Sequence, residues 1–287
     1  ISTVYMFKII FTVFLISSFI TPIQSQDKLI ISSIPDESVT ELHKKFLPLT
    51  EYLESKTKRK VDFFSVTNYS SVVEALSQGK VDMAWLGGLT YIQAKIRSNE
   101  NVEPVIQRVK DSMFTSVFIT HVDNEIEVLE DLKNKSFSFG SPSSTSGHLM
   151  PRLFLEKQNI NPEEYFGKIG YSGAHDATIF SVLSKKVSAG ALNSLVWEKF
   201  TRENPNKAKK LKVFFITSKY YDYNWTIRKD LSNEIKETLI NSFLELDYNN
   251  PDHKKILDLQ RAKKYIKTND NNYTDIFIAG KKTGLIK

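Results

Sequence analysis

The sequence predicts an α/β fold, in which short strands alternate with amphipathic helices. Apolar runs of strand length recur between stretches with helical spacing of apolar residues. The first helical stretch carries one apolar stripe, formed by Val39, Leu42, Phe46, Leu49 and Leu53. Alternation of this kind is typical of sheets covered by helices, rather than of sandwiches or helical bundles.

The expected elements follow one another from residue 29 almost to the end of the chain. Strands are expected at 29–33, 61–66, 81–86, 102–109, 114–122, 136–140, 168–171, 187–192 and 211–217. Helices are expected at 39–56, 70–78, 89–97, 146–157, 176–185, 195–202, 232–246, 252–260 and about 273–280.

Residues 1–25 have the features of a secretory signal peptide, with possible upstream read-through before Met6. Lys8 supplies a positive charge, residues 9–20 are mostly apolar, and a polar stretch with the small Ser25 follows. The apolar run is short for a membrane span, so an uncleaved anchor is the less favoured alternative. We therefore expect export to the periplasm and cleavage of the signal.

Composition excludes several classes of protein. The chain has no cysteine, which rules out a disulfide-stapled module and a thiol nucleophile. Its formal net charge of +6 is spread over lysine-rich loops, which favours a solvated surface over nucleic-acid binding. Five scattered histidines without cysteine make a metal site or metal cofactor unexpected. The length is sufficient for a substantial core, in two lobes.

Three junctions between a strand and the following helix combine small residues with hydrogen-bond donors. They lie at 87–91, 143–147 and 172–176. The second carries three consecutive hydroxyl side chains, Ser144, Thr145 and Ser146, and no Lys or Arg. Because a helix N-terminus attracts anions, these hydroxyls could hold a small oxyanion without a buried counter-charge, although one such turn alone would be an ordinary cap. Three junctions favour convergence on one anionic ligand.

These three stretches together resemble the phosphonate/phosphite-type periplasmic solute-binding proteins of ABC transporters. The resemblance rests on residues 81–91, 144–151 and 172–177, in this order, and covers most of the mature chain. It implies a two-lobed periplasmic binding protein of type II, with two strands crossing the hinge and the ligand in the cleft. Lobe 1 would comprise residues 26–117 and 217–287, and lobe 2 residues 118–216.

The resemblance also implies roles for single residues. Ser144, Thr145 and Ser146 correspond to a clamp on the oxyanion, Tyr91 to a phenol donor from the other lobe, and His175 to an imidazole donor. Asp222 corresponds to the acidic residue near the second hinge crossing. Four further candidates at the cleft are Asp36, Trp85, Asn193 and Trp225. The competing interpretation is a solvated turn for Asp36 and core packing for the two tryptophans.

The ligand implied is a small tetrahedral oxyanion. Family members that bind aminoalkylphosphonates carry a further acid, and residues 190–193 of this chain contain none. Phosphite or methylphosphonate is therefore favoured, with aminoalkylphosphonates and selenate-like oxyanions as alternatives. We expect a monomer that passes its ligand to a permease–ATPase complex in the inner membrane.

A secreted hydrolase is the distant alternative. Ser146, His175 and Asp176 are the residue types of a catalytic triad, but the sequence has no Gly-x-Ser-x-Gly elbow. A triad is defined by geometry, so the arrangement of these three side chains discriminates between the two functions. The favoured interpretation is a receptor without catalytic activity.

Overall fold

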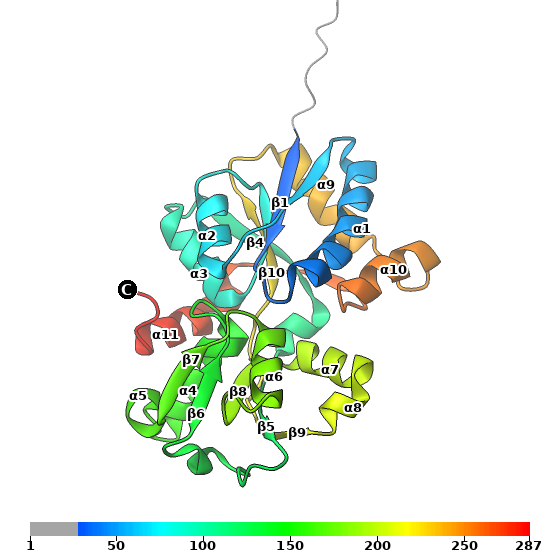
Figure 1. The fold of residues 1–287 in the computed structure, drawn as a ribbon. Coiled ribbons are helices and arrows are strands. Elements are labelled where there is room, and N and C mark those ends of the chain that lie inside the picture. Colours follow the sequence, from blue (N-terminus) through cyan, green and yellow to red (C-terminus); the bar gives the residue numbers. More distant parts are fainter. Residues whose placement is uncertain (1–27) are drawn as a thin grey trace, which may run out of the picture.

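The computed structural model describes residues 28–287, and the predicted signal peptide lies outside this range. Two sheets, one of six strands and one of five, organise two lobes, which Figure 1 shows one above the other. The prediction of an α/β fold is thereby confirmed. Within the described residues, no helix is both long and apolar enough to cross a membrane.

Lobe 1 is built on the six-stranded sheet, in the order β11-β4-β10-β3-β1-β2. Strand β1 is parallel to both β2 and β3, whereas β10 is antiparallel to β3 and β4. The strands are β1 (Leu29–Ser33), β2 (Val61–Phe64), β3 (Met83–Leu86), β4 (Val102–Arg108), β10 (Asn224–Arg228) and β11 (Tyr265–Lys267).

Helices cover this sheet in two groups. Helices α1 (Val39–Thr57), α9 (Asn233–Leu244) and α10 (Pro251–Leu259) pack together on one side. On the other side lie α2 (Tyr69–Ser77), α3 (Gly88–Arg97) and α11 (Thr274–Lys282), which follows the 3₁₀ turn η4 (Asp270–Tyr273). The stripe of α1 is buried as predicted, except for its first member, Val39, which is exposed.

Lobe 2 is built on the five-stranded sheet, in the order β7-β6-β8-β5-β9. Its strands are β5 (Ser116–His121), β6 (Ser136–Phe139), β7 (Lys168–Tyr171), β8 (Ala189–Asn193) and β9 (Leu211–Ile216). Its helices are α4 (Met150–Lys157), α5 (Pro162–Tyr165), α6 (His175–Leu183), α7 (Ser194–Glu203) and α8 (Pro205–Ala208). A 3₁₀ turn, η2 (Leu129–Leu132), precedes β6.

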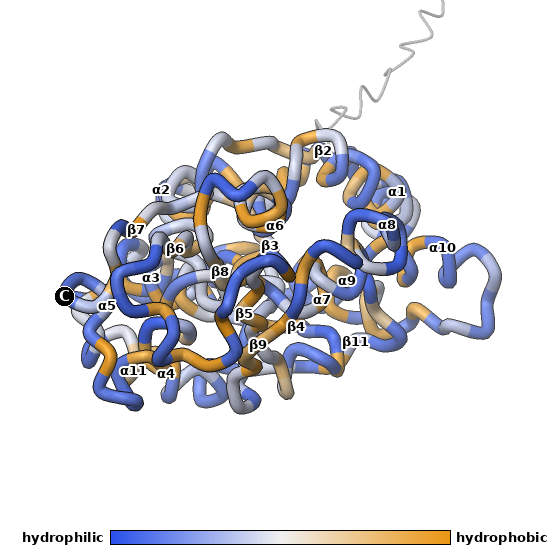
Figure 2. The backbone as a smooth tube through the Cα atoms, turned by 60° about the horizontal axis from the view of Figure 1, so that its bottom comes forward, coloured by the Kyte–Doolittle hydropathy of each residue, from blue (hydrophilic) through white to orange (hydrophobic). Residues whose placement is uncertain are grey.

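The side-chain alternation of β5 divides the core of lobe 2 between the two faces of its sheet. Phe118 packs with Phe137 and with Leu155 of α4, whereas its neighbours Val117 and Ile119 pack with α6 and α7. This is the period of two that an extended strand imposes. In Figure 2 apolar residues gather along the strands inside the molecule, and hydrophilic residues colour the outer loops.

The chain passes between the lobes twice. The first passage includes the 3₁₀ turn η1 (Val109–Met113), and the second lies between β9 and β10. The two passages meet at Phe114 and Tyr220, whose backbones exchange hydrogen bonds of 2.8 and 3.0 Å. Strand β5 of lobe 2 begins at Ser116, two residues before the predicted boundary.

Two differences from the expected elements bear on the site. Strands β10 and β11 were not predicted, although β10 is central in the sheet of lobe 1 and its side chains are almost all buried. The helix expected from residue 146 begins only at Met150, after a π-helical turn, η3 (Thr145–Leu149). Such turns occur frequently at functional sites because they redirect the backbone within a helical segment.

In both sheets the strand order reverses beside the first parallel strand, since β1 lies between β2 and β3, and β6 lies between β7 and β8. Ligands of open α/β sheets bind beyond the carboxyl ends of strands at such a switch point. The loops after β3 and β6 meet between the lobes, where a backbone N–H of α3 contacts the turn at Thr145. The fold therefore brings the first two predicted junctions together, and His175 of the third lies beside them, 3.2 Å from the position of a Cβ on Gly147.

Candidate functional site

The hydroxyl-rich turn after β6 is buried and held in a fixed conformation. Ser144, Thr145 and Ser146 are each at most 2% exposed. The Ser144 hydroxyl accepts a hydrogen bond from the Gly147 N–H at 2.9 Å. The Gly140 N–H donates to the Gly147 carbonyl at 2.8 Å, which ties the turn to the end of β6. A Cβ on Gly147 would lie 2.9 Å from the Ser144 hydroxyl oxygen, so this close approach requires glycine.

The start of helix α3 faces this turn from lobe 1. The Leu89 N–H donates to Thr145 Oγ1 at 2.9 Å, and the Gly88 N–H donates to Asp222 Oδ1 at 3.1 Å. A Cβ on Gly87 would lie 2.8 Å from Thr145 Oγ1 and 3.0 Å from Asp222 Oδ1. Glycine at position 87 therefore permits the two lobes to approach at the helix N-terminus.

Asp222 lies at the centre of the group and is fully buried. Burial raises the pKa of its carboxyl to about 7, against the opposing effects of the Gly88 N–H and the Thr145 and Ser146 hydroxyls. Its second oxygen, Oδ2, has no hydrogen-bond partner among the described residues. A buried carboxylate oxygen without a partner is costly, so the site is complete only when a ligand supplies one.

Tyr69, the first residue of α2, is a site residue that the sequence analysis missed. It is 1% exposed, and its hydroxyl has no hydrogen-bond partner among the described residues. Burial raises the pKa of the phenol well above its usual value, while the neighbouring Ser144 hydroxyl lowers it. Tyr69 therefore brings a neutral donor from lobe 1 to the hydroxyl turn. Its position just after the junction that follows β2 was the available signal.

Tyr91 was predicted to be this donor, but the structure does not bring it to the turn. Its hydroxyl donates to the carboxylate of Asp270, which also pairs with Lys95 at 2.7 Å. Its ring packs edge-on against Tyr273, with the centroids 5.2 Å apart. As the fourth residue of α3, Tyr91 points towards η4 and α11 instead of the helix N-terminus.

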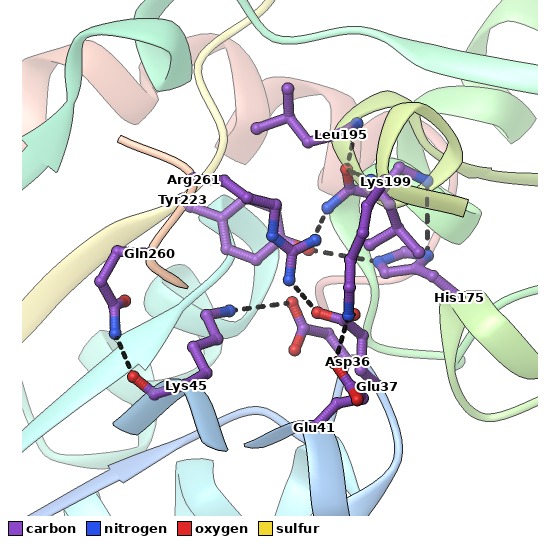
Figure 3. A network of polar contacts seen from close by, with 12 residues as sticks. Asp36, Glu37, Glu41, Lys45, His175, Leu195, Lys199, Tyr223, Gln260 and Arg261 are labelled. Carbon is purple, nitrogen blue, oxygen red and sulfur yellow. Dashed lines mark hydrogen bonds and ion pairs between the residues drawn. The ribbon is translucent and has the colours of Figure 1, made fainter. Parts of the chain in front are cut away.

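His175 contacts the group through Tyr223, another residue that the sequence analysis passed over (Figure 3). Burial lowers the pKa of the imidazole to about 4, against the effect of Asp36, so the ring is neutral near pH 7. Its Nδ1 accepts the Asn193 N–H at 3.4 Å, which places the proton on Nε2, 3.2 Å from the Tyr223 hydroxyl. The Asn193 amide donates to the same hydroxyl at 2.8 Å. Because the Tyr223 hydroxyl oxygen accepts both of these hydrogen bonds, its own proton is free to be donated to another group.

The remaining candidates divide between the site and the core. Asp36 is buried, with its Oδ2 3.9 Å from Lys45 Nζ and its Oδ1 without a partner among the described residues. Trp85 stacks on Tyr223 at 5.3 Å and supports that ring. Trp225 packs against Phe243 in the core of lobe 1, so the structure favours the core interpretation for it.

The buried cation behind Tyr223 is already neutralised. Arg108 donates to the Asp111 carboxylate through Nε at 2.8 Å and through Nη2 at 2.7 Å. The hydroxyl turn, the start of α3, Tyr69 and Tyr223 instead present neutral donors. Within residues 28–287, no group of three or more His, Asp or Glu side chains is arranged to hold a metal ion. The arrangement suits a small oxyanion bound by hydrogen bonds, with one carboxyl group beside it.

Comparison with known proteins agrees with this geometry. The family described as "ABC transporter, phosphonate, periplasmic substrate-binding protein" matches residues 31–273. The chain belongs to this family. The resemblance stated from the sequence is thereby confirmed.

Two relatives have sequences similar to most of the chain. A probable phosphite-binding protein of an ABC transporter from Prochlorococcus marinus (strain MIT 9301) is 36% identical, over 95% of this chain and 96% of that protein. The phosphonates-binding periplasmic protein of Escherichia coli (strain K12) is 27% identical, over 86% of this chain and 75% of that protein.

Two solved structures have the same architecture. The Prochlorococcus marinus protein in complex with methylphosphonate matches with a TM-score of 0.86 and 35% identity, over 90% of this chain and 99% of that chain. A binding protein component of a phosphonate ABC transporter from Pseudomonas aeruginosa matches with a TM-score of 0.82 and 26% identity, over 88% and 85%. These matches confirm the predicted two-lobed fold.

Proposed function

We propose that this protein binds a small phosphorus oxyanion, methylphosphonate or phosphite, between its lobes and delivers it to a membrane permease–ATPase complex. Family membership supports the transport role. The buried group of neutral donors around Asp222 supports the ligand class. We further propose that the chain acts as a monomer and reaches the periplasm through cleavage of its N-terminal signal.

The unpartnered oxygen of Asp222 is the observation that carries this ligand assignment. A carboxylate beside an oxyanion is repulsive unless one proton is shared between them. Monoanions of phosphite and methylphosphonate carry a P–OH that Asp222 Oδ2 can accept. Because the Asp222 pKa is about 7, the carboxyl group ionises readily enough to accept that proton near neutral pH.

The ligand would be held from both lobes. The hydroxyls of Ser144, Thr145 and Ser146 would donate from lobe 2, and the unpartnered hydroxyl of Tyr69 from lobe 1. The start of α3 would support the site by holding Thr145 and Asp222 in place. Since these donors meet only when the lobes are together, the ligand would favour the closed state by contacts that an open state lacks. The permease would then recognise closure.

The geometry favours binding over hydrolysis. The two imidazole nitrogens of His175 face Tyr223 and the Asn193 backbone. The Asp176 carboxylate accepts the Ser38 and Ala177 N–H groups at 2.9 and 2.8 Å. A triad would require Asp176 to orient the imidazole towards a serine hydroxyl, and these contacts do not provide that.

Isothermal titration calorimetry with a ligand panel tests the assignment. The panel contains methylphosphonate, phosphite, 2-aminoethylphosphonate, phosphate, sulfate and selenate. Methylphosphonate or phosphite should bind more tightly than the others. The amine is disfavoured because residues 190–193 contain no acid to pair with it. Preferred binding of selenate or of the aminoalkylphosphonate would contradict the proposal, as would turnover of a phosphonate or ester.

A further inference from the structure

A network of charged side chains joins the two lobes (Figure 3). Lys199 of α7, in lobe 2, contacts the carboxylates of Glu37 and Glu41 in lobe 1. The Lys199 Nζ lies 3.0 Å from Glu37 Oε1 and also bonds Glu41 Oε2. On the other side of Glu37, Arg261 bonds its second carboxylate oxygen.

We propose that Glu37, Glu41, Arg261 and Lys199 form an interlobe latch, which raises the closed fraction of the protein and thereby its affinity for ligand. The contacts between Lys199 and the two glutamates cross the cleft, whereas the contact between Arg261 and Glu37 lies within lobe 1. Opening the lobes would break the contacts of Lys199 with the two glutamates and keep the contact between Arg261 and Glu37.

The latch is less accessible to solvent and salt than an ordinary surface ion pair. The side chain of Glu37 is 3% exposed, and those of Lys199 and Arg261 are 17% and 14% exposed. Burial alone would raise the pKa of Glu37, but Arg261, Lys45 and Lys199 more than compensate and lower it to about 2. Glu37 is therefore ionised whenever the protein is folded near neutral pH. Arg261 holds its carboxylate in place before Lys199 arrives.

The same edge of the cleft carries two further contacts between the lobes. The His175 N–H donates to the Asp36 carbonyl at 3.0 Å, and the Ser38 N–H donates to Asp176 Oδ2 at 2.9 Å. Helix α7 is itself linked to the ligand site, because Asn193 caps it at Leu195 and donates to the Tyr223 hydroxyl (Figure 3). The latch thus lies outside the oxyanion site and is mechanically connected to it.

The effect on affinity follows from linkage. When only the closed state binds tightly, the apparent dissociation constant is the intrinsic constant divided by the closed fraction. Partly buried ion pairs of this kind change equilibria by about three- to tenfold. Loss of Lys199 should therefore weaken binding by that factor, mainly through faster ligand release, and leave the oxyanion contacts intact.

The absence of cysteine from the sequence allows a direct measurement of closure. Glu51→Cys on α1 and Lys209→Cys next to α8 place dyes on exposed residues of the two lobes. Figure 1 shows α1 and α8 on the same side of the molecule. Energy transfer between them would be compared, without ligand and at low salt, in the parent, Lys199→Met and Lys199→Arg proteins. Lys186→Met, which alters an exposed lysine elsewhere in lobe 2, is the matched control.

We expect Lys199→Met to lower the energy transfer of the ligand-free protein and to raise the dissociation constant for methylphosphonate about three- to tenfold. Lys199→Arg should restore both, and Lys186→Met should change neither. Added potassium chloride should reduce closure of the parent more than that of Lys199→Met. Equal closure in parent and Lys199→Met would overturn the latch.

The measurement of the dissociation constant rests on the proposed function, whereas the measurement of energy transfer in the ligand-free protein does not. If no oxyanion of the panel binds, the ligand assignment fails, and the energy-transfer comparison still decides the latch. Glu41→Gln provides a second test, because Glu41 is half-exposed and contacts Lys199 directly. Its effect should disappear in the Lys199→Met background, and full additivity of the two effects would contradict the proposal.

Discussion

The oxyanion site and the interlobe latch join the same two lobes by opposite chemistry. The site uses hydroxyl and backbone N–H donors around one carboxyl group, all nearly inaccessible to solvent. The latch uses full charges that remain partly exposed. Neutral donors at fixed positions distinguish one anion from another, because each has to match a particular oxygen or proton. Attraction between full charges lacks such selectivity, and salt weakens it where the charges remain partly exposed.

The difference assigns separate tasks to the two regions. Substitutions in the site should change which ligand binds and by how much, whereas substitutions in the latch should change all ligands equally. Substitutions in the site test this division, from the largest expected effect on affinity to the smallest.

Gly87→Ala should have the largest effect. The added Cβ would lie 2.8 Å from Thr145 Oγ1 and 3.0 Å from Asp222 Oδ1, so both side chains would have to leave the positions in which they would hold the ligand. Calorimetry should show methylphosphonate affinity lowered by about a hundredfold or more, the equivalent of losing about two hydrogen bonds to a charged group. Gly170→Ala is the control, because a Cβ there meets no atom within 4 Å. Wild-type affinity in Gly87→Ala would show that the lobes need not approach so closely.

Asp222→Asn should alter selectivity more than stability. One proton is shared between Asp222 and the ligand. Sulfate needs the protonated carboxyl, which is lost as pH rises through about 7, whereas the methylphosphonate monoanion brings its own proton and needs the ionised carboxyl. In the parent, the preference for methylphosphonate over sulfate should grow between about pH 6 and about pH 7.5. The substitution should reduce the preference by about tenfold or more and remove its pH dependence. A preference that is unaffected would mean that Asp222 does not contact the anion.

A comparison of two tyrosines tests which phenol belongs to the site. Tyr69→Phe removes the unpartnered hydroxyl beside Ser144 and should weaken methylphosphonate binding by about tenfold. Tyr91→Phe removes a hydroxyl that bonds Asp270 and should leave affinity unchanged, with a small loss of thermal stability. The reverse pattern would restore the role first expected for Tyr91.

These two tyrosines also show which features of the site could be predicted from the sequence and which could not. The strand and helix pattern placed three polar junctions correctly at strand ends, because burial periodicity is a local property. It could not show which side of α3 Tyr91 occupies, since that depends on how η4 and α11 pack against the helix. Strand β10 was missed for a similar reason. Its five residues become a strand only through pairing with β3 and β4, far away in sequence.

The remaining expected effect concerns the stability of the ligand-free protein, rather than its affinity for ligand. The pKa of Asp222 is about 7 in the folded protein and ordinary, near 4, in the unfolded chain, so the folded state binds a proton more tightly. The stabilisation from this proton is complete below about pH 4 and is lost as pH rises to about 7. Asp222→Asn, which cannot ionise, should therefore gain thermal stability relative to the parent as pH increases across this range. Melting curves of both proteins without ligand would measure the difference, and saturating methylphosphonate should reverse its sign near pH 7. A difference that is constant with pH would mean that Asp222 ionises at its ordinary pKa, and the shared-proton account of selectivity would then fail.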